Sequence, residues 1–284
     1  MTSLKRYIPQ PSVSDNNAYA LVTGGSSGIG KQYASQLARD YHYNLLLVSN
    51  QDTELKQVSN ELNQQYGVCI KTLCIDLAQN NAAEQVFDFA QEQQLEIDVL
   101  INNAGFLIFD AFVNVPTQKV EAILLLHTLT ATKLCHLFAN RWRLSTDQHR
   151  RFILNMSSMS AWMAMPTIQC YNATKSYIYN FSKALWYELS LFNIHVLAVT
   201  PGSTDTGLLP FPDTFGNILR ATGITMKPAT LVKKALHSLF YSNKKSCMPG
   251  LWNHIIVPII NHLPDWLIFA VMKRLPMFNP TINS

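Results

Sequence analysis

Residues 23–30 read TGGSSGIG and lie between a short apolar run at residues 18–23 and a helix-length amphipathic run at residues 28–39. Glycines in such a turn allow a tight bend, a close approach of the backbone to a pyrophosphate, and close helix–strand packing. The start of the helix adds free N–H groups and the positive end of its dipole. A glycine-rich turn alone is often an ordinary loop, but the strand and helix beside this one favour a dinucleotide site. We therefore expect cofactor contacts from Thr23, Gly24, Ser26, Ser27, Gly28, Ile29 and Gly30.

Apolar strand-like runs alternate with helix-length runs from residue 18 to about residue 241. Such alternation predicts a parallel sheet with right-handed crossovers, and strands that are apolar on both faces predict helices on both sides. The chain is thus predicted to form a single α/β domain, a Rossmann-like doubly wound parallel sheet, at residues 18–248. A flexible arm at residues 1–17 precedes it, and an apolar helical extension at residues 249–284 packs on the same domain. We place strands at residues 18–23, 43–49, 68–75, 97–102, 152–157 and 195–200, and helices at residues 28–39, 52–66, 82–93, 117–142, 168–191 and 230–241.

The composition narrows the class of protein. The 284 residues are 48% hydrophobic and 14% charged, and the net charge of +4 is spread along the chain, which argues against nucleic-acid binding. The five cysteines form no CxxC pair, so we expect a reducing compartment and no metal site. The first 17 residues lack the apolar core of a secretory signal. We therefore expect a cytoplasmic protein.

Two motifs resemble those of one enzyme family. The glycines at residues 23–30 follow the spacing TGxxxGxG, and the fourth predicted strand ends in Asn102-Asn103-Ala104-Gly105. Both features resemble the short-chain dehydrogenase/reductase family, in particular members akin to 17β-hydroxysteroid and long-chain 3-oxoacyl reductases. The resemblance covers about residues 18–274. It implies an NAD(P)(H)-dependent oxidoreductase that interconverts a carbonyl and an alcohol, the cofactor carrying the hydride.

Tyr171 and Lys175 lie four residues apart at the start of a predicted helix, and so project from one face. A tyrosine has an ordinary pKa of about 10, and a nearby ammonium is expected to lower it. The segment YNATK resembles the family's Y-x-A-[ST]-K, and Ser158 stands thirteen residues before the tyrosine, at the family's spacing. Ser157 and Ser160 are the competing serines, as ordinary turn residues. The resemblance implies that Tyr171 exchanges a proton with the carbonyl oxygen, that Ser158 hydrogen-bonds that oxygen, and that Lys175 also holds the nicotinamide ribose.

One residue departs from the family pattern. The family's fourth catalytic residue is an asparagine that supports a water next to the lysine, and counting forward from Gly105 places His127 there. An imidazole also holds water and passes protons, so proton relay through His127 is one hypothesis. A packed, hydrogen-bonded core histidine is the alternative.

The end of the second predicted strand bears on the choice of cofactor. An acid there would repel a 2′-phosphate, and the chain instead has Ser49 and Asn50, which can donate to one. Relatives that prefer NADP usually carry an arginine where Asn50 stands. We expect NADP(H) to be preferred, with NAD(H) as the alternative. By resemblance, Asp76 meets the adenine amino group, although an Asp that starts a helix explains it equally well. The resemblance implies further cofactor contacts from Leu77, Asn103, Ala104, Gly105, Pro201, Gly202, Thr204 and Thr206, beside Tyr171 and Lys175.

The substrate side is apolar. Residues 203–227 carry leucines and phenylalanines and predict a lid over an apolar small-molecule carbonyl or alcohol, a ketone or aldehyde of the steroid or acyl-chain class. The tail is predicted to form short helices broken near Pro258 and Pro264, too interrupted for a membrane span. Three roles compete for it: a cover for the pocket, a subunit contact in a homodimer or homotetramer, and a peripheral membrane contact. We expect the first two together. A nucleotide-sensing binding protein on the same fold is the alternative to an enzyme.

Overall fold

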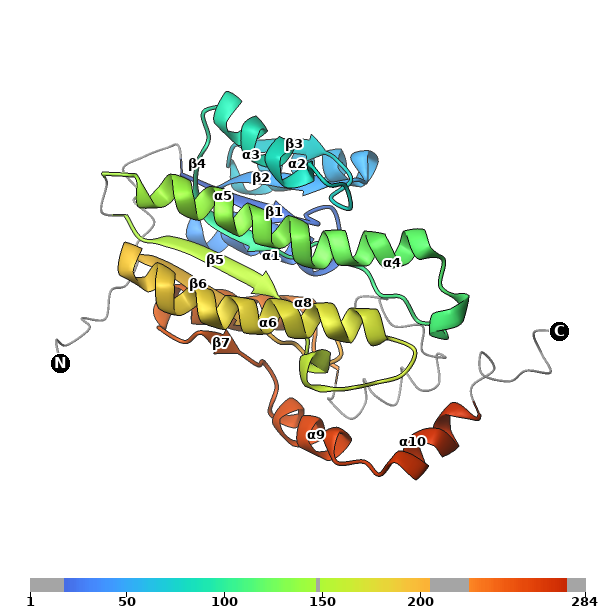
Figure 1. The fold of residues 1–284 in the computed structure, drawn as a ribbon. Coiled ribbons are helices and arrows are strands. Elements are labelled where there is room, and N and C mark those ends of the chain that lie inside the picture. Colours follow the sequence, from blue (N-terminus) through green and yellow to red (C-terminus); the bar gives the residue numbers. More distant parts are fainter. Residues whose placement is uncertain (1–17, 147–148, 205–224, 275–284) are drawn as a thin grey trace, which may run out of the picture.

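The computed structural model describes residues 18–146, 149–204 and 225–274, which form one parallel sheet flanked by helices (Figure 1). The strand order is β3-β2-β1-β4-β5-β6-β7. Six of these strands confirm the predicted ones to within two residues at each end. The seventh is a parallel two-residue strand beside β6, too short to leave a periodic pattern in the sequence. The strands are β1 (Ala18–Thr23), β2 (Asn44–Ser49), β3 (Ile70–Cys74), β4 (Glu96–Asn102), β5 (Arg151–Met156), β6 (Ile194–Val199) and β7 (Ser246–Cys247).

Two apolar layers hold the helices against the sheet. Ala20 and Val22 of β1 belong to the layer under α1, α2 and α8, whereas Leu21 belongs to the layer under α3, α5 and α6. This alternation confirms the doubly wound arrangement, because each strand buries side chains on both faces of the sheet. The helices are α1 (Gly28–Tyr41), α2 (Asp52–Tyr66), α3 (Ala82–Glu92), α4 (Thr117–Leu124), α5 (Ala131–Arg143), α6 (Gln169–Leu189) and α8 (Pro228–Tyr241).

The long helix predicted at residues 117–142 is not regular throughout. A π-helical turn at Leu125–Thr130 separates α4 from α5, and it buries the side chains of His127 and Thr130. A π turn inserts one extra residue into a helix and is often found at functional sites. Within the described part of the chain, the run Thr117–Arg143 is also the one helix long and apolar enough to cross a membrane. Its inward side packs in the core of the domain, as Leu134 and Phe138 show.

The turn after β1 is tied to the end of β4. The Thr23 hydroxyl oxygen accepts hydrogen bonds from the backbone N–H groups of Asn103 (2.9 Å) and Ala104 (3.0 Å). The Asn103 side-chain amide donates to the carbonyl of Thr23 at 3.0 Å. These three bonds join the two central strands at their carboxyl ends. The packing of this turn against the end of β4 therefore fixes one side of the site.

The tail forms α9 (Leu251–Asn261) and α10 (Asp265–Met272). The expected break before α10 is present at Pro264, but Pro258 lies inside α9, so the prediction of a break there is wrong. Asn253 and Val257 of α9 are buried. No side chain of α10 is buried, and the helix extends away from the sheet (Figure 1). The expected packing on the domain therefore describes α9 and not α10.

The close approach of α1 to the turn makes a prediction about stability. A Cβ atom on Gly30 would lie 1.9 Å from the carbonyl oxygen of Gly24, so Gly30→Ala must push backbone aside. We expect it to lower the free energy of unfolding by about 1–3 kcal/mol, measured by urea denaturation without cofactor. Gly28→Asn is the control, since nothing lies within 4 Å of a Cβ there and asparagine tolerates its φ of +53°. Equal losses in the two variants would contradict this explanation.

Candidate active site

Three predicted catalytic residues, Ser158, Tyr171 and Lys175, lie together at the carboxyl edge of the sheet. Ser158 follows β5 and begins the 3₁₀ turn Met159–Trp162 (η3), where its hydroxyl oxygen accepts from the Ser160 N–H at 3.2 Å. Tyr171 and Lys175 lie in the first turns of α6, and the side chains of Ser158 and Tyr171 are hydrogen-bonded. The competing Ser157 is buried and donates to the Lys175 carbonyl at 2.7 Å. Ser158 is thus the serine that reaches the tyrosine.

The Lys175 side chain is hydrogen-bonded to the end of a strand of the sheet. Its Nζ donates to the carbonyl oxygen of Met156, the last residue of β5, at 2.9 Å. The same nitrogen lies 5.4 Å from the centre of the Tyr171 ring. Burial lowers the pKa of Lys175 to about 8, because the charged form is poorly solvated. The ammonium is therefore the dominant form at neutral pH and is lost as the pH rises past about 8.

The tyrosine hydroxyl behaves differently from the expectation. Burial raises the pKa of Tyr171 above its ordinary value, and the hydrogen bond with Ser158 offsets this only in part. The prediction that Lys175 lowers this pKa does not hold for the arrangement in the structure, since the lysine nitrogen bonds to Met156 and faces the ring rather than the hydroxyl. Tyr171 is consequently protonated at neutral pH and can serve as a proton donor.

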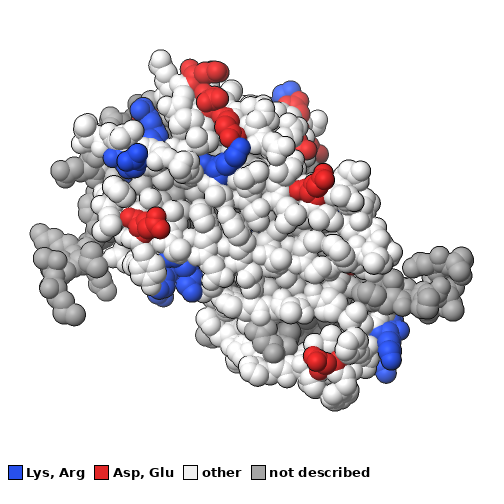
Figure 2. All heavy atoms as spheres, viewed as in Figure 1, with Lys and Arg blue, Asp and Glu red and all other residues white. Residues whose placement is uncertain are grey.

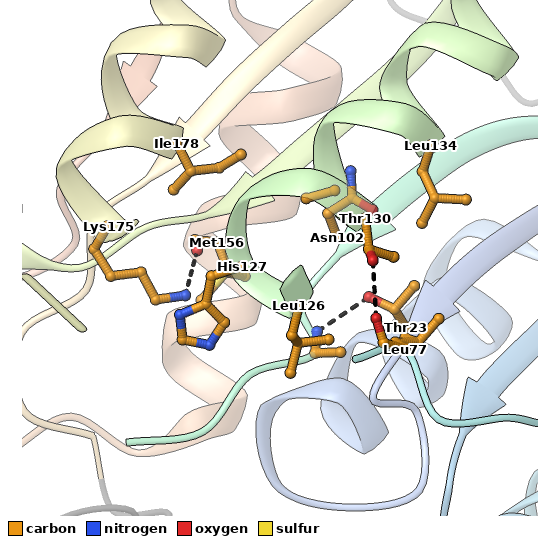
Figure 3. Close-up of a pocket in the computed structure, with 12 residues that line it drawn as sticks. Thr23, Leu77, Asn102, Leu126, His127, Thr130, Leu134, Met156, Lys175 and Ile178 are labelled. Carbon is orange, nitrogen blue, oxygen red and sulfur yellow. Dashed lines mark hydrogen bonds between the residues drawn. The ribbon is translucent and has the colours of Figure 1, made fainter. Parts of the chain in front are cut away.

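His127 lies on the π turn, beside the Lys175 side chain (Figure 3). Its Nε2 is 3.1 Å from the N–H of Phe106, and its Nδ1 is 3.0 Å from the Thr174 hydroxyl. Its ring edge packs against Tyr171, with ring centres 5.7 Å apart. Both ring nitrogens are engaged by the protein, so this arrangement does not offer the free nitrogen that a proton relay requires. The alternative of a packed, hydrogen-bonded histidine fits these contacts.

A small cavity of about 20 Å³ lies between the lysine and the glycine turn (Figure 3). Lys175 and His127 border it on one side and Thr23 on the other. Asn102 also lines it, and the Oδ1 atom of that side chain is buried without a protein partner. The sequence indicated Asn102 only as part of the motif at residues 102–105, and it did not single out Thr130, which lies inside the helix predicted at residues 117–142.

The glycine turn fits the pyrophosphate of a dinucleotide. Ser27, which caps α1, makes no hydrogen bond to the helix with its side chain, and no acidic residue lies in the first helical turn. A Cβ on Gly28 would point into open space. The positive end of α1 is thus open to an anion, with no carboxylate nearby on the helix to repel it.

The adenosine end of the site differs in detail from the expectation. Ser49 is buried, and its hydroxyl bonds to Ser26 at 2.9 Å, while Ser26 donates to the Gln51 side chain at 2.8 Å. Ser49 therefore has a hydrogen-bond partner inside the protein, and its contact with a phosphate stays a prediction. Asn50 and Gln51 are exposed. Sequence patterns did not single out Gln51, which lies two residues beyond the strand at the N-cap of α2.

The remaining predicted contacts occupy the loops after β3 and β6. Asp76 is exposed and its carboxylate accepts from the Ala78 N–H at 2.9 Å, whereas Leu77 is buried. The Pro201 carbonyl accepts from the N–H of Met159 at 2.8 Å, which fixes the loop after β6 beside η3. The Thr204 hydroxyl donates to the carbonyl of Gly202 at 3.1 Å.

The tail contributes a side chain to this region that the sequence did not indicate. Asn253 of α9 lies directly over Gly202 and donates to the Pro249 carbonyl at 2.6 Å. The first half of the tail is therefore part of the wall beside the loop after β6. Thr206 and most of the predicted lid, residues 205–224, lie outside the described residues.

Known proteins share this fold and these motifs. The sequence profile of the short chain dehydrogenase family matches residues 18–211. The very-long-chain 3-oxoacyl-CoA reductase of Coccidioides immitis (strain RS) is 30% identical over 93% of this chain and 74% of its own length. The bulky-bulky ketone specific alcohol dehydrogenase from Comamonas testosteroni matches with a TM-score of 0.71 and 27% identity, covering 93% of this chain and 97% of its own. A short-chain dehydrogenase from Sphingobium yanoikuyae in complex with NADPH matches with a TM-score of 0.71 and 26% identity, covering 94% and 100%. The chain is therefore an oxidoreductase that belongs to the short chain dehydrogenase family.

Proposed function

We propose that this protein reduces a lipophilic ketone or aldehyde to the alcohol, with NADP(H) as the preferred cofactor. The observation that carries the proposal is the convergence of Ser158, Tyr171 and Lys175 beside the open N-terminus of α1. Two hydroxyl groups and an ammonium at this edge of the sheet can bind a carbonyl oxygen and supply its proton.

The chemistry follows from the charge states of these groups. A bound nicotinamide supplies the hydride to the carbonyl carbon. Tyr171 is protonated at neutral pH because burial raises its pKa, so its hydroxyl donates a proton to the carbonyl oxygen. Ser158 donates a hydrogen bond to the same oxygen, so that the negative charge developing there meets a donor already in place. Proton transfer leaves Tyr171 as a negatively charged phenolate. The Lys175 ammonium, which donates to the carbonyl of Met156, provides positive charge near this phenolate.

The lipophilic class of substrate is supported from two sides. The relatives named above act on very-long-chain 3-oxoacyl-CoA and on bulky ketones, according to their names. In this chain, η3 and α9 contact each other beside Ser158, and Met163 and Val257 are buried there. Apolar side chains beside the catalytic serine suit an apolar ligand.

The preference for NADP(H) rests on the absence of a carboxylate at the end of β2. Asn50 and Gln51, both exposed, are followed by Asp52, whose carboxylate is bonded to Lys56 on α2. A 2′-phosphate would meet amide donors there rather than an unpaired acid. The Sphingobium yanoikuyae relative is in complex with NADPH.

We further propose that two copies associate through the outer face of α4, α5 and α6. Figure 2 shows that the centre of this face carries almost no Lys, Arg, Asp or Glu. Leu124, Leu129 and Tyr177 are exposed on it. A sparsely charged face with exposed apolar side chains favours association of copies as a homodimer or homotetramer.

For α10 we propose a peripheral contact with a lipid surface, while a cytoplasmic location stays a prediction. Trp266, Phe269 and Val271 are exposed, and Lys273 and Arg274 follow at the end of the helix. Aromatic and cationic side chains beside an apolar helix suit the headgroup region of an anionic membrane. Eight residues of helix measure about 12 Å, so α10 would lie in the surface and not span the bilayer.

The role of Tyr171 is tested by removing its hydroxyl alone. Tyr171→Phe is expected to lower kcat for carbonyl reduction by roughly 10²–10⁴-fold, with NADPH affinity retained, because only the proton donor is lost. Tyr187→Phe is the matched control, since this tyrosine lies on the same helix and its side chain is exposed. NADPH oxidation with a panel of ketones and aldehydes gives the rates. An enzyme that consumes NADPH with no carbonyl in the panel would favour the nucleotide-sensing alternative.

Cofactor preference is tested at Asn50. The wild-type protein should bind NADPH more tightly than NADH by calorimetry, and Asn50→Asp should shift the ratio toward NADH, because a carboxylate repels the 2′-phosphate. Asn60→Asp adds the same charge on the exposed side of α2 and should leave the ratio unchanged. Wild-type binding that favours NADH tenfold, about 1.4 kcal/mol, would reverse the assignment.

The tail is tested by ending the chain at two points. A chain ended after Leu263 lacks α10 and should stay active but no longer float with phosphatidylserine vesicles, whereas the full chain floats. A chain ended after Met248 also lacks Asn253 and Val257, and should lose affinity for apolar substrates. Sedimentation velocity should give the same oligomer for the full chain and the chain without α10. A smaller oligomer without α10 would mean that the helix is a subunit contact.

A further inference from the structure

The π turn connects three segments that surround the site. Thr130 donates from its hydroxyl to the carbonyl of Leu77, in the loop after β3, at 2.8 Å. His127 contacts Phe106, in the loop after β4, and Thr174 on α6. A regular α-helix turns 100° per residue, and the extra residue of a π turn changes which side chains face inward. The irregularity therefore lets His127 and Thr130 both point into the domain.

The hydrogen bonds determine which nitrogen of His127 carries the proton. The Phe106 N–H can only donate, so Nε2 accepts and is unprotonated. The Thr174 hydroxyl donates its one hydrogen to the carbonyl of Tyr171 at 2.9 Å, so it accepts from His127. Nδ1 is consequently the protonated nitrogen. A continuous chain of bonds runs from Phe106 through the imidazole and Thr174 to the backbone of the catalytic tyrosine.

Steric contacts reinforce this chain. A Cβ on Gly105 would lie 2.6 Å from Nε2 of His127, so the loop passes closer to the ring than any other residue type would allow. On the opposite side the ring edge faces Tyr171. The imidazole thus fills the space between the loop that ends β4 and the first turn of α6.

We propose that His127 is a positioning residue which, as the neutral tautomer protonated on Nδ1, holds the first turn of α6 in register with the loop after β4. The proposal rests on the proposed function, because the register it fixes is that of Tyr171 relative to the bound nicotinamide and carbonyl. Proton relay is not part of this role.

The cationic form of His127 cannot perform this positioning role. A proton on Nε2 would point at the N–H of Phe106, and two donors facing each other break the bond. The ring is buried, and Lys175 is the charged group whose field reaches it. Both effects lower the pKa of His127 well below its ordinary value. The neutral form of His127 is therefore the dominant one at neutral pH, where the lysine is charged.

The tautomer can be observed without any substrate. Long-range ¹H–¹⁵N correlation of protein labelled on histidine separates the two nitrogens, and the signals missing from His127→Leu identify this ring. We expect a protonated Nδ1 and an unprotonated Nε2 at every pH from 5 to 8, with and without NADPH. A ring protonated on Nε2, or one that titrates in this range, would overturn the proposal whatever the enzyme does.

The positioning role is tested at the other end of the bond. Thr174→Val removes the hydroxyl at almost constant volume, and we expect kcat to fall roughly ten- to a hundredfold, with the NADPH dissociation constant unchanged. Thr174→Ser should restore most of kcat, which general damage to the fold would not explain. Thr53→Val, at an exposed threonine on α2, is the matched control.

A double variant separates positioning from relay. Because His127 and Thr174 share one chain of bonds, His127→Leu should cost little more in the Thr174→Val background than Thr174→Val alone. The pH dependence of kcat should keep its midpoints in both single variants. Additive losses, or a midpoint lost with His127→Leu, would refute the positioning role and favour the relay. A wild-type enzyme that reduces no carbonyl while its tautomer is as expected would count against the proposed function alone.

Discussion

The structure depends on the parallel direction of its strands, which places every carboxyl end at one edge of the sheet. Thr23, Asn103, Ser158 and Pro201 are far apart in the sequence, yet the loops after β1, β4, β5 and β6 that carry them meet there. The bond from the Asn103 N–H to the Thr23 hydroxyl joins the two central strands at that edge. Hydrogen bonds at this edge then hold the glycine turn, the Lys175 side chain and η3 in place.

The sequence predicted the fold well where a whole run of residues shows the same hydrophobic pattern. Six strands and the doubly wound arrangement follow from runs of apolar residues, since each run must be buried on two faces. The exceptions have local causes. The π turn at Leu125–Thr130 depends on contacts made by His127 and Thr130, and hydrophobic periodicity does not report a single added residue. Pro258 inside α9 shows that a proline lowers helix stability without always ending the helix.

At the site, motif spacing predicted which residues lie there better than it predicted their hydrogen bonds and pKa values. Spacing selected Ser158 over Ser157, and the hydrogen bond to Tyr171 agrees with that choice. The direction of the tyrosine pKa and the inward hydroxyl of Ser49 could not be predicted, because burial and the orientation of a hydrogen bond depend on the packed protein. For His127 the sequence left two roles open, and the identity of its two partners distinguishes them.

The two edges of the sheet have a consequence for how copies of the protein meet. An edge strand with free backbone groups can pair with the edge of another sheet and so begin aggregation. One edge here is β7, whose two residues offer almost no length for such pairing, and the other is β3, which carries Lys71. A charged side chain on a short edge opposes continued strand addition. In the proposed association of copies, side chains of helices pack together, and such a contact is limited in extent by its own symmetry.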